Sequence, residues 1–409
     1  MKDKKILIVG AGDFQLPIVK AAARRGSVVL AAPAVPEEFL AYVDKICIAD
    51  VRDKEKILAF ARQERIDAVQ TDQTDLPVRT VAYVAEQMGL PGNSYQTARL
   101  FSEKNLMRDR MKELGLPLLP YRVIHTLEEA KAFYKELSAA PVIVKPMGTQ
   151  GSRGVVEITK EEEIEDAFAL AMKFSDDGNI LIEKCAHGIE FVMETAVVNG
   201  VCTDLILGDT HYFSKKSLFS AKERIFPSVE SEEICQKIRE LNRAIVEGFG
   251  LKQGVTHGEY IVDDGQPYLL EIAARGGGVF ISSDLIHLRT GLETEEFLLD
   301  LALTGQAEPV VKETGVFCGY RAFYLPAGTV ESIEGIEYVK ALPYVHSTQL
   351  HHLAEGMHVE ESSNKTSRIA LIVSAADYDE WQRNVEHIRD HLHVMVRNAN
   401  GDLEDIIWD

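Results

Sequence analysis

The sequence has few cysteines and no arrangement of them that could form a zinc knuckle or a disulfide framework. There are five cysteines in 409 residues, they lie far apart, and no two are separated by only two residues. An odd number of scattered cysteines is typical of reduced thiols in a cytoplasmic protein. The sequence therefore predicts a cytoplasmic location and no structural disulfide bonds.

The sequence also lacks a long apolar run and an excess of basic residues. No apolar stretch approaches the roughly 20 residues of a membrane span, and the N-terminus shows no signal-peptide pattern. Lys and Arg total 44 against 64 Asp and Glu, a formal net charge of −20. This balance argues against nucleic acid or a membrane as a partner, while a local basic pocket for a phosphorylated ligand remains compatible with it.

What the sequence does contain is enough apolar material for several domains. Apolar residues make up 46% of the chain, and 409 residues leave room for about two to four domains. The first section, residues 1–115, alternates apolar segments with helical patterns, which predicts an α/β domain with a parallel sheet. Strands are expected at 5–9, 28–32 and 67–71, and helices at 14–25, 53–65, 76–88 and 95–114.

Two further sections follow the first. Residues 116–305 mix strands and helices around a glycine-rich turn and a predicted hairpin, which indicates an α+β arrangement. Residues 306–409 combine short strands with one helix at 376–391, which predicts a small C-terminal α+β domain.

The segment Gly10-Ala11-Gly12 after the first strand is a weak match to a dinucleotide-binding fingerprint. That fingerprint requires a third glycine where this chain has Gln15. It also requires an acidic residue at the end of the second strand, which here ends at Ala32. We therefore interpret these glycines as a structural turn.

A glycine-rich segment at 149–155 follows a predicted strand at 142–145. Glycines allow backbone N–H groups to converge on an anion, and a serine and an arginine in the segment add donors. It is not a P-loop, because it lacks the Gly-Lys-Ser/Thr ending. Lys145 ends the buried-looking strand before it, and a lysine there is costly unless it meets a partner such as a phosphate. The alternative is an ordinary hairpin loop.

Two glutamates are predicted to face each other across a hairpin. If the turn between 255 and 275 centres on Gly265, facing residues have numbers that add to 530, so Glu259 lies opposite Glu271 and His257 opposite Ala273. Like charges in that position repel unless a cation lies between them. Carboxylate oxygens suit Mg²⁺ or Mn²⁺, so we predict a metal site there. The alternative is two solvated glutamates on an exposed face.

Other charged and histidine-rich segments carry less information. The segment Lys222-Glu223-Arg224 reads as a solvated loop that could contact phosphate or substrate. The histidines between 346 and 358 have no regular ligand spacing. His387 and His391 are one helical turn apart without any HExxH pattern, so we interpret them as a solvated helix face.

Taken together, these features resemble the ATP-grasp superfamily, over residues 1–305 above all. Within it the chain is most similar to the biotin carboxylase and carbamoyl-phosphate synthetase large-chain branch and to the related L-amino-acid ligases. The resemblance implies an ATP-grasp fold: an N-terminal α/β domain at 1–115, a lid subdomain at about 120–188, and a central antiparallel part at about 189–305. ATP would lie between the last two, and a small α+β domain at 306–409 would follow.

The resemblance also implies which residues bind ATP. Lys104 and Lys145 would contact its phosphates, and Glu190 would bind the ribose. Glu183, with the backbone of Lys184 and Ala186, would form the hinge that contacts adenine. A mobile loop would cover the β- and γ-phosphates, formed by Gly151, Ser152, Arg153, Gly154 and Val155.

The same resemblance makes Glu259 and Glu271 ligands of Mg²⁺ or Mn²⁺. Arg275 corresponds to an arginine that steadies acyl-phosphate oxygens, and with Lys145 it is the expected catalytic residue. The family usually has an asparagine where this chain has Ala273, so the number of metal ions is open. His257 could replace that asparagine, although a packed, hydrogen-bonded histidine is the simpler interpretation.

The function expected from this resemblance is ATP-dependent joining of a small carboxylic acid, such as an amino acid, to an amine. Phosphoryl transfer converts the carboxylate into an acyl phosphate that the amine can attack. Backbone N–H groups of Gly276, Gly277 and Gly278 are expected to bind a carboxylate or oxyanion. A bicarbonate-activating carboxylase is one alternative, although no Met-Lys-Met biotinyl segment is present, and a non-catalytic nucleotide-binding module is another. A homodimer is one open arrangement.

Overall fold

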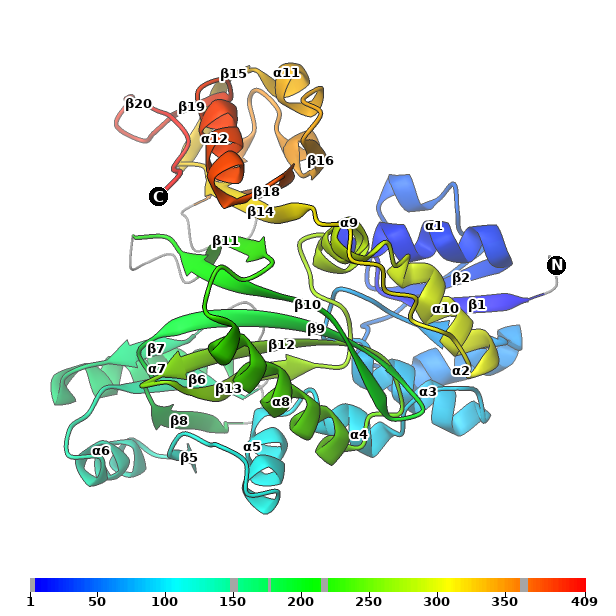
Figure 1. The fold of residues 1–409 in the computed structure, drawn as a ribbon, viewed down its shortest axis with the longest axis horizontal. Coiled ribbons are helices and arrows are strands. Elements are labelled where there is room, and N and C mark those ends of the chain that lie inside the picture. The colour runs from blue at the N-terminus through cyan, green and yellow to red at the C-terminus, as the bar shows by residue number, and fades with distance from the viewer. Residues whose placement is uncertain (1–3, 148–153, 176–177, 215–219, 361–366) are drawn as a thin grey trace.

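The computed structural model describes residues 4–147, 154–175, 178–214, 220–360 and 367–409. Their strands form four sheets, and a long central sheet runs across the molecule between the N-terminal and C-terminal parts (Figure 1). None of the described helices is both long enough and apolar enough to cross a membrane. All five cysteines are unpaired, as expected.

The N-terminal part is a parallel α/β unit, as predicted. Its strand order is β3-β2-β1-β4, and every pair is parallel. The strands are β1 (Lys5–Val9), β2 (Ser27–Ala32), β3 (Lys45–Ile48) and β4 (Ala68–Gln70). The helices are α1 (Leu16–Arg25), α2 (Lys54–Glu64), α3 (Val78–Met88), α4 (Tyr95–Leu100) and α5 (Lys104–Glu113).

The single helix expected at 95–114 is two helices, α4 and α5, so that prediction was wrong. The chain leaves the helical path between them because Phe101 is buried against Phe249, with ring centroids 5.3 Å apart. The Ser102 hydroxyl closes α4 by donating to the carbonyl of Ala98 at 2.8 Å. This break makes Lys104 the first residue of α5.

The lid is a four-stranded antiparallel sheet of order β5-β8-β6-β7 with two helices against it. Its hydrophobic core joins the two helices to the strands, so it packs as a unit of its own. Its elements are β5 (Tyr121–Ile124), α6 (Leu127–Glu136), β6 (Val142–Pro146), β7 (Val156–Ile158), α7 (Ile164–Phe174) and β8 (Ile180–Lys184).

The central sheet has eight strands in the order β13-β12-β9-β10-β11-β14-β18-β16. It begins in the central part and continues without a gap into the C-terminal part, because β11 pairs with β14. Its first five strands are β9 (Ile189–Val198), β10 (Val201–Tyr212), β11 (Ala221–Phe226), β12 (Gln253–Asp263) and β13 (Gln266–Ala273). The remaining three are β14 (Phe317–Tyr324), β16 (Val345–Thr348) and β18 (Arg368–Ala375).

The two faces of the central sheet are covered by different helices. Phe191 and Met193 of β9 pack in one core with α8 (Glu232–Phe249), while Val192 and Ala196 join another core with α9 and α10. The alternation follows from the two-residue period of a strand. The helices of the second face are η4 (Ile281–Leu285), α9 (Ile286–Thr290) and α10 (Thr294–Thr304).

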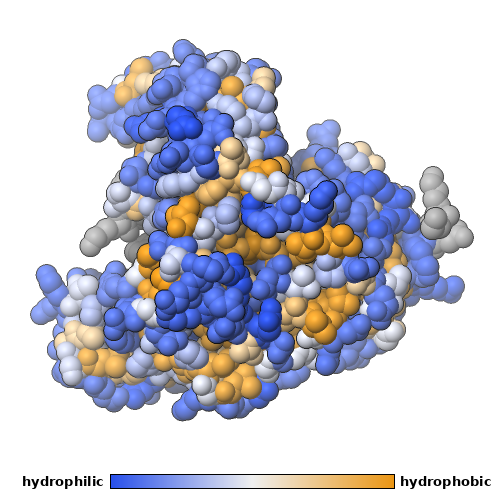
Figure 2. Space-filling view, viewed as in Figure 1, coloured by the Kyte–Doolittle hydropathy of each residue, from blue (hydrophilic) through white to orange (hydrophobic). Residues whose placement is uncertain are grey.

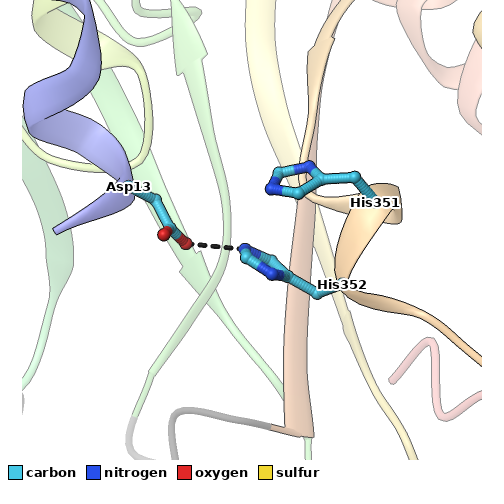
Figure 3. Close-up of side chains that lie close together, drawn as sticks. All are labelled: Asp13, His351 and His352. Carbon is cyan, nitrogen blue, oxygen red and sulfur yellow. Dashed lines mark hydrogen bonds and ion pairs between the residues drawn. The ribbon is translucent and has the colours of Figure 1, made fainter. Parts of the chain in front are cut away.

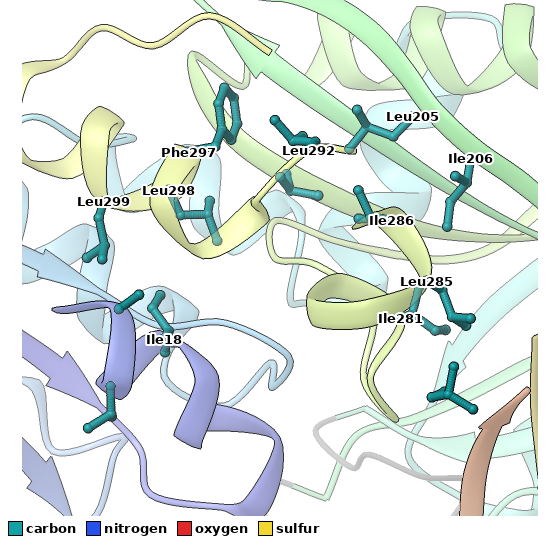
Figure 4. Packing of buried hydrophobic residues seen from close by; sticks show 14 of the residues in the cluster. Ile18, Leu205, Ile206, Ile281, Leu285, Ile286, Leu292, Phe297, Leu298 and Leu299 are labelled. Carbon is teal, nitrogen blue, oxygen red and sulfur yellow. The ribbon is translucent and has the colours of Figure 1, made fainter. Parts of the chain in front are cut away.

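One hydrophobic core joins the N-terminal unit to the central sheet. Ile18 of α1, Leu205 and Ile206 of β10, and Phe297 of α10 belong to it (Figure 4). All of them are buried. Because burying each such side chain contributes about 1.5–3 kcal/mol, this core fixes the N-terminal unit beside the central sheet.

The C-terminal part is α+β, as predicted. Its second sheet has the order β17-β15-β19-β20, from β15 (Gly328–Glu334), β17 (His358–Val359), β19 (His393–Arg397) and β20 (Leu403–Glu404). The expected helix at 376–391 is α12 (Tyr378–Arg389), and two short helices are α11 (Ile336–Lys340) and η5 (Leu350–His352). The space-filling view shows apolar residues gathered in a band beneath this part (Figure 2).

Candidate active site

Glu259 and Glu271 are paired directly across the β12–β13 hairpin, and His257 is paired with Ala273, as predicted. The turn itself differs from the prediction. Asp263 pairs with Gln266, so the facing residue numbers add to 529 at the turn instead of the predicted 530. A β-bulge at Leu270 supplies the one-residue shift that brings the two glutamates opposite each other.

Each of these glutamates is bound to a basic side chain from elsewhere in the chain. Lys104 Nζ lies 2.8 Å from Glu271 Oε1, and Arg224 donates to Glu259. The side chains remain partly accessible, with 44% of Glu271 and 31% of Glu259 exposed. Burial opposes ionisation of Glu259, but Arg224 and His257 hold its pKa well below the usual value. Glu259 is therefore ionised, and both side chains are accessible enough for a cation to reach them.

His257 is buried and hydrogen-bonded on both ring nitrogens. Nδ1 bonds Glu194, and Nε2 lies 3.0 Å from Arg224 Nη1 and 3.3 Å from Glu259 Oε1. Burial lowers the pKa of His257, but Glu194 raises it above the usual value overall. These contacts agree with the interpretation of His257 as a packed, hydrogen-bonded histidine.

Arg275 ends the hairpin and reaches back to the N-terminal unit. Its Nε lies 2.5 Å from Asp75 Oδ1, and the charges of Glu194 and Glu259 also raise its pKa. Arg275 therefore feels the charge of Glu259, but its ion-pair partner in this structure is Asp75. No local pattern marks Asp75, which lies 200 residues away.

The prediction that the glycines after Arg275 offer free N–H groups was wrong for two of them. Gly276 N–H donates to Asp72 Oδ1 at 2.9 Å, and Gly277 N–H donates to Glu194 Oε2 at 2.9 Å. These amides do bind carboxylates, but the carboxylates belong to this chain. Both bonds join segments far apart in sequence, so they hold the loop in place.

The lysine expected at the nucleotide is buried in a three-residue ionic cluster. Lys145 donates to Glu183, and Arg108 Nε lies 3.2 Å from the other oxygen of the same carboxylate. Burial alone would raise the pKa of Glu183, but Lys145 and Arg108 lower it to about 2. Burial lowers the pKa of Lys145, and the nearby charge of Lys104 acts in the same direction. In this structure Lys104 and Lys145 are each ion-paired with a glutamate, Glu271 and Glu183.

Arg108 also supports the hairpin. Its Nη2 donates to the carbonyl of Leu270 at 2.8 Å, and Leu270 is the bulged residue. At a bulge, one residue of the strand is left without a hydrogen-bond partner on the neighbouring strand. Arg108 supplies a partner for the carbonyl of Leu270. The same buried guanidinium therefore joins Glu183 in the lid to the β12–β13 hairpin.

The other expected nucleotide residues lie around the lid. Glu190 is the second residue of β9 and accepts a hydrogen bond from Tyr212 at 2.5 Å, and burial raises its pKa to about 7. Lys184 N–H already donates to Pro120 at 2.9 Å, and Ala186 follows β8. Gly154 and Val155 lead into β7, whereas Gly151, Ser152 and Arg153 lie outside the described residues. Gly154 has a φ of +74° and is packed against Phe174, which a glycine tolerates.

Three residues at this site were not predicted from the sequence, because Arg108, Asp75 and Glu194 carry no local motif. Arg224 was expected in a solvated loop that could contact phosphate or substrate, but it lies on a strand and binds Glu259. Arg224 lies on β11, where buried and half-buried residues alternate, and that alternation is the signal that could have placed it on a strand.

The family comparisons identify two regions of the chain. Residues 138–284 match the family described as ATP-grasp domain, and residues 321–397 match L-amino acid ligase C-terminal domain 2. The first match contains the hairpin glutamates and the lid strands from β6 onward, and the second lies within the C-terminal α+β part.

Two relatives are named ligases. The alanine–anticapsin ligase of Bacillus subtilis (strain 168) is 27% identical over 272 residues, which cover 62% of this chain and 57% of that protein. The phosphoribosylamine–glycine ligase of Pyrococcus abyssi is 26% identical over 295 residues, which cover 67% and 66%. The chain thus matches less than two thirds of the length of either relative.

Solved structures share the whole fold. The L-amino acid ligase from Bacillus licheniformis superposes with a TM-score of 0.82 at 24% identity, covering 97% of this chain and all of that one. A biotin carboxylase from Campylobacter jejuni superposes with a TM-score of 0.74 at 18% identity, covering 99% and 92%. This likeness establishes the ATP-grasp architecture predicted from the sequence.

Proposed function

We propose that this chain, whose residues 138–284 match the ATP-grasp domain family, is an ATP-dependent carboxylate–amine ligase. The observation that carries the proposal is the pair Glu259 and Glu271, which face each other among the basic side chains of Lys104, Arg224 and Arg275. ATP would transfer its γ-phosphoryl group to a substrate carboxylate. The amine would then attack the acyl phosphate, forming an amide with release of phosphate and ADP.

The hairpin fits a hard divalent cation. Two carboxylates face each other at one point and both are partly exposed, and carboxylate oxygens are ligands that suit Mg²⁺ or Mn²⁺. Glu259 and Glu271 would hold the ion. When bound, it would neutralise phosphate charge, a role that positively charged groups share in phosphoryl transfer.

The basic residues have separate proposed roles. Lys104 and Lys145 bind phosphate oxygens, and Glu183 keeps Lys145 in place through a buried ion pair. Glu190 binds the ribose, and the backbone of Lys184 and Ala186 contacts adenine. The loop that includes Gly154 and Val155 excludes water, which would otherwise hydrolyse the acyl phosphate.

Arg275 is the proposed catalytic residue on the acyl side. It lies beside Glu194 and Glu259, and its ion pair with Asp75 leaves it anchored rather than free to rotate. A pre-placed guanidinium stabilises negative charge that develops in the transition state without reorganising at that moment.

An amino acid is the proposed carboxylic substrate. The match of residues 321–397 to L-amino acid ligase C-terminal domain 2 supports this class, as do relatives that are named for ligation of alanine or glycine. A cytoplasmic location follows the same proposal and rests on the five free thiols.

The experiment is a release assay for ADP and phosphate with Mg²⁺ and pairs of amino acids. We expect release that depends on both an amino acid and an amine, together with an amide product seen by mass spectrometry. Release that depends on bicarbonate without an amine, and gives a carboxylated product, would favour the carboxylase alternative. Nucleotide binding without turnover of any pair would favour a binding module.

A further inference from the structure

Asp13 and two consecutive histidines of the C-terminal part converge on one point. His352 Nε2 lies 2.6 Å from Asp13 Oδ2, and one ligand atom from each of Asp13, His351 and His352 lies within 4.8 Å of the others. Figure 3 shows both imidazole rings beside the Asp13 carboxylate, with the dashed line drawn from His352. Asp13 and His352 are 339 positions apart and come from opposite ends of the chain.

Asp13 is held rigidly on its side of the cluster. It begins η1 (Asp13–Gln15), directly after the turn at the end of β1. The buried Gln15 fixes that turn, because its Oε1 accepts from Gly12 N–H at 2.7 Å and its Nε2 donates to Thr71 at 3.2 Å. Phe14 stacks edge-on against Phe280, with ring centroids 5.1 Å apart.

The histidine side is held equally well. Both histidines lie on η5, whose first residue, Leu350, is buried in the C-terminal core. Gln349 exchanges backbone and side-chain hydrogen bonds with Ala370 of β18. Ser347, just before η5, donates to Asp284 beside η4. The cluster therefore joins two parts of the fold that are each fixed before any ligand arrives.

The three side chains of the cluster share a single hydrogen bond, between His352 and Asp13. The two imidazole rings have centroids 3.9 Å apart, and His351 has no hydrogen-bond partner among the residues that the structure describes. The His351 ring is exposed, so water can solvate it. What singles out the cluster is that a ligand atom of His351 lies within 4.8 Å of those of Asp13 and His352, so that one cation with an open coordination shell would bind all three at once.

We propose that Asp13, His351 and His352 form a binding site for a divalent transition-metal cation, by their chemistry Zn²⁺, that ties the N-terminal unit to the C-terminal part. Two imidazole nitrogens and one carboxylate oxygen, with a fourth position for water, are a common Zn²⁺ ligand set. Bonds of about 2.0–2.2 Å place tetrahedral ligand atoms about 3.4 Å apart, so small rotations of these partly exposed side chains close the site. This site is separate from the Mg²⁺ hairpin and does not depend on the proposed ligase activity.

The test measures Zn²⁺ and Co²⁺ binding to the full chain after chelator treatment. The described residues contain a second three-residue cluster of this kind, Glu157, Cys185 and His187, so the readout is the difference between wild type and variants. We expect His351→Ala and Asp13→Asn to lose about one equivalent of Zn²⁺, or to bind it at least ~10-fold more weakly. We also expect them to lose the visible absorption of tetrahedral Co²⁺.

His351→Ala is the decisive variant and His346→Ala its matched control. His351 takes no part in the Asp13–His352 bond, so its loss leaves that ion pair intact, and His346 bonds Ser374 in the same part of the fold. Zn²⁺ should raise the melting temperature of wild type and His346→Ala but not of His351→Ala, because a ligand stabilises only the state it binds. Equal metal uptake and equal melting shifts in all three proteins would overturn the proposal and leave a plain ion pair.

Discussion

Two sets of carboxylates in this protein differ in their partners. Glu183, which is buried, and Glu259, which is half-buried, are each bound to a guanidinium, and the pKa of Glu183 falls to about 2. Asp72 and Glu295 are buried like Glu183 but have no cation bound, and burial raises their pKa values to about 6 and about 8. Burial acts in the same direction in both groups, so the cation decides the outcome.

The two groups also lie in different places. Glu183 and Glu259 lie at the candidate active site, where they bind Lys145 and Arg224. Asp72 bonds the backbone of Gly276 and Glu295 lies on α10, and each has one carboxylate oxygen without a hydrogen-bond partner among the described atoms. Glu183 and Glu259 thus bind cationic side chains, whereas the burial of Asp72 and Glu295 lowers the free energy of unfolding by an amount that depends on pH.

The largest expected effect is at the metal hairpin. Glu259→Gln and Glu271→Gln each remove one of the facing charges, and we expect ATP turnover to fall by ~10³-fold or more, since a lost metal ligand removes transition-state stabilisation. ADP release at saturating Mg²⁺ measures this, with circular dichroism to show that the variants fold. Glu233→Gln, on the exposed face of α8, is the control. Near-normal release by both hairpin variants would contradict the metal-site interpretation.

A smaller effect is expected at Arg275. Arg275→Ala should lower kcat by about 100-fold and change the KM for ATP little, because its contact would strengthen mainly in the transition state. Steady-state kinetics with the active substrate pair measures both constants.

The variant Asp75→Asn distinguishes the proposed catalytic role of Arg275 from a purely structural role. It removes the ion pair of Arg275 but keeps the guanidinium. If Arg275 acts on the substrate, Asp75→Asn retains much more activity than Arg275→Ala. Equal losses in the two variants would mean that the ion pair, rather than the arginine itself, is what catalysis requires.

The next largest effect is expected on the KM for ATP, when Lys145 loses its buried ion-pair partner Glu183. In Glu183→Gln, Lys145 keeps the burial and the neighbouring charges of Arg108 and Lys104 that lower its pKa, but loses the carboxylate that opposes them. We expect the KM for ATP to rise about 10-fold, and to rise more steeply with pH than in wild type, since a deprotonated lysine cannot bind phosphate. The KM measured between pH 6.5 and 9 tests this. A pH-independent increase would instead indicate a packing defect.

The sequence predicted much of this fold because its signals are local. Alternating strands and helices identified the N-terminal unit, and the hairpin count placed Glu259 opposite Glu271. That count was right at the glutamates only because a bulge at Leu270 compensates for a tighter turn. The bulge depends on Arg108, which is 162 residues away and carries no pattern that connects it to the hairpin.

The functional side chains that could not be predicted from the sequence are held by contacts between residues far apart in the chain. Asp75 meets Arg275, and Asp13 meets His352, only because the sheets bring their loops together. The break between α4 and α5 was hidden for the same reason, since Phe101 leaves the helix for a core contact that local propensity does not describe. The domain boundaries at 115 and 305 and the roles of the nucleotide residues stay predictions.

The smallest expected effect is on stability, at Glu295. Its pKa is raised to about 8 by burial and by the nearby charge of Asp72, from an ordinary value of 4.5. The folded state therefore holds this proton more tightly than the unfolded state. The contribution of the Glu295 proton to the free energy of unfolding is complete below about pH 4.5. It is lost as the pH rises through about 8.

Glu295→Gln replaces the carboxyl with a neutral group of the same shape. We expect the variant to lose the decline in stability between about pH 4.5 and 8, so that above pH 8 it is more stable than wild type by ~2 kcal/mol. Urea midpoints at several pH values measure this, with the exposed Glu308→Gln as control. Asp72 retains its own, lower transition near pH 6 in the variant, so a residual decline below pH 7 is expected. A wild-type decline that persists unchanged in Glu295→Gln would show that Glu295 is ionised in the folded protein, and that a cation or water reaches its unpartnered oxygen.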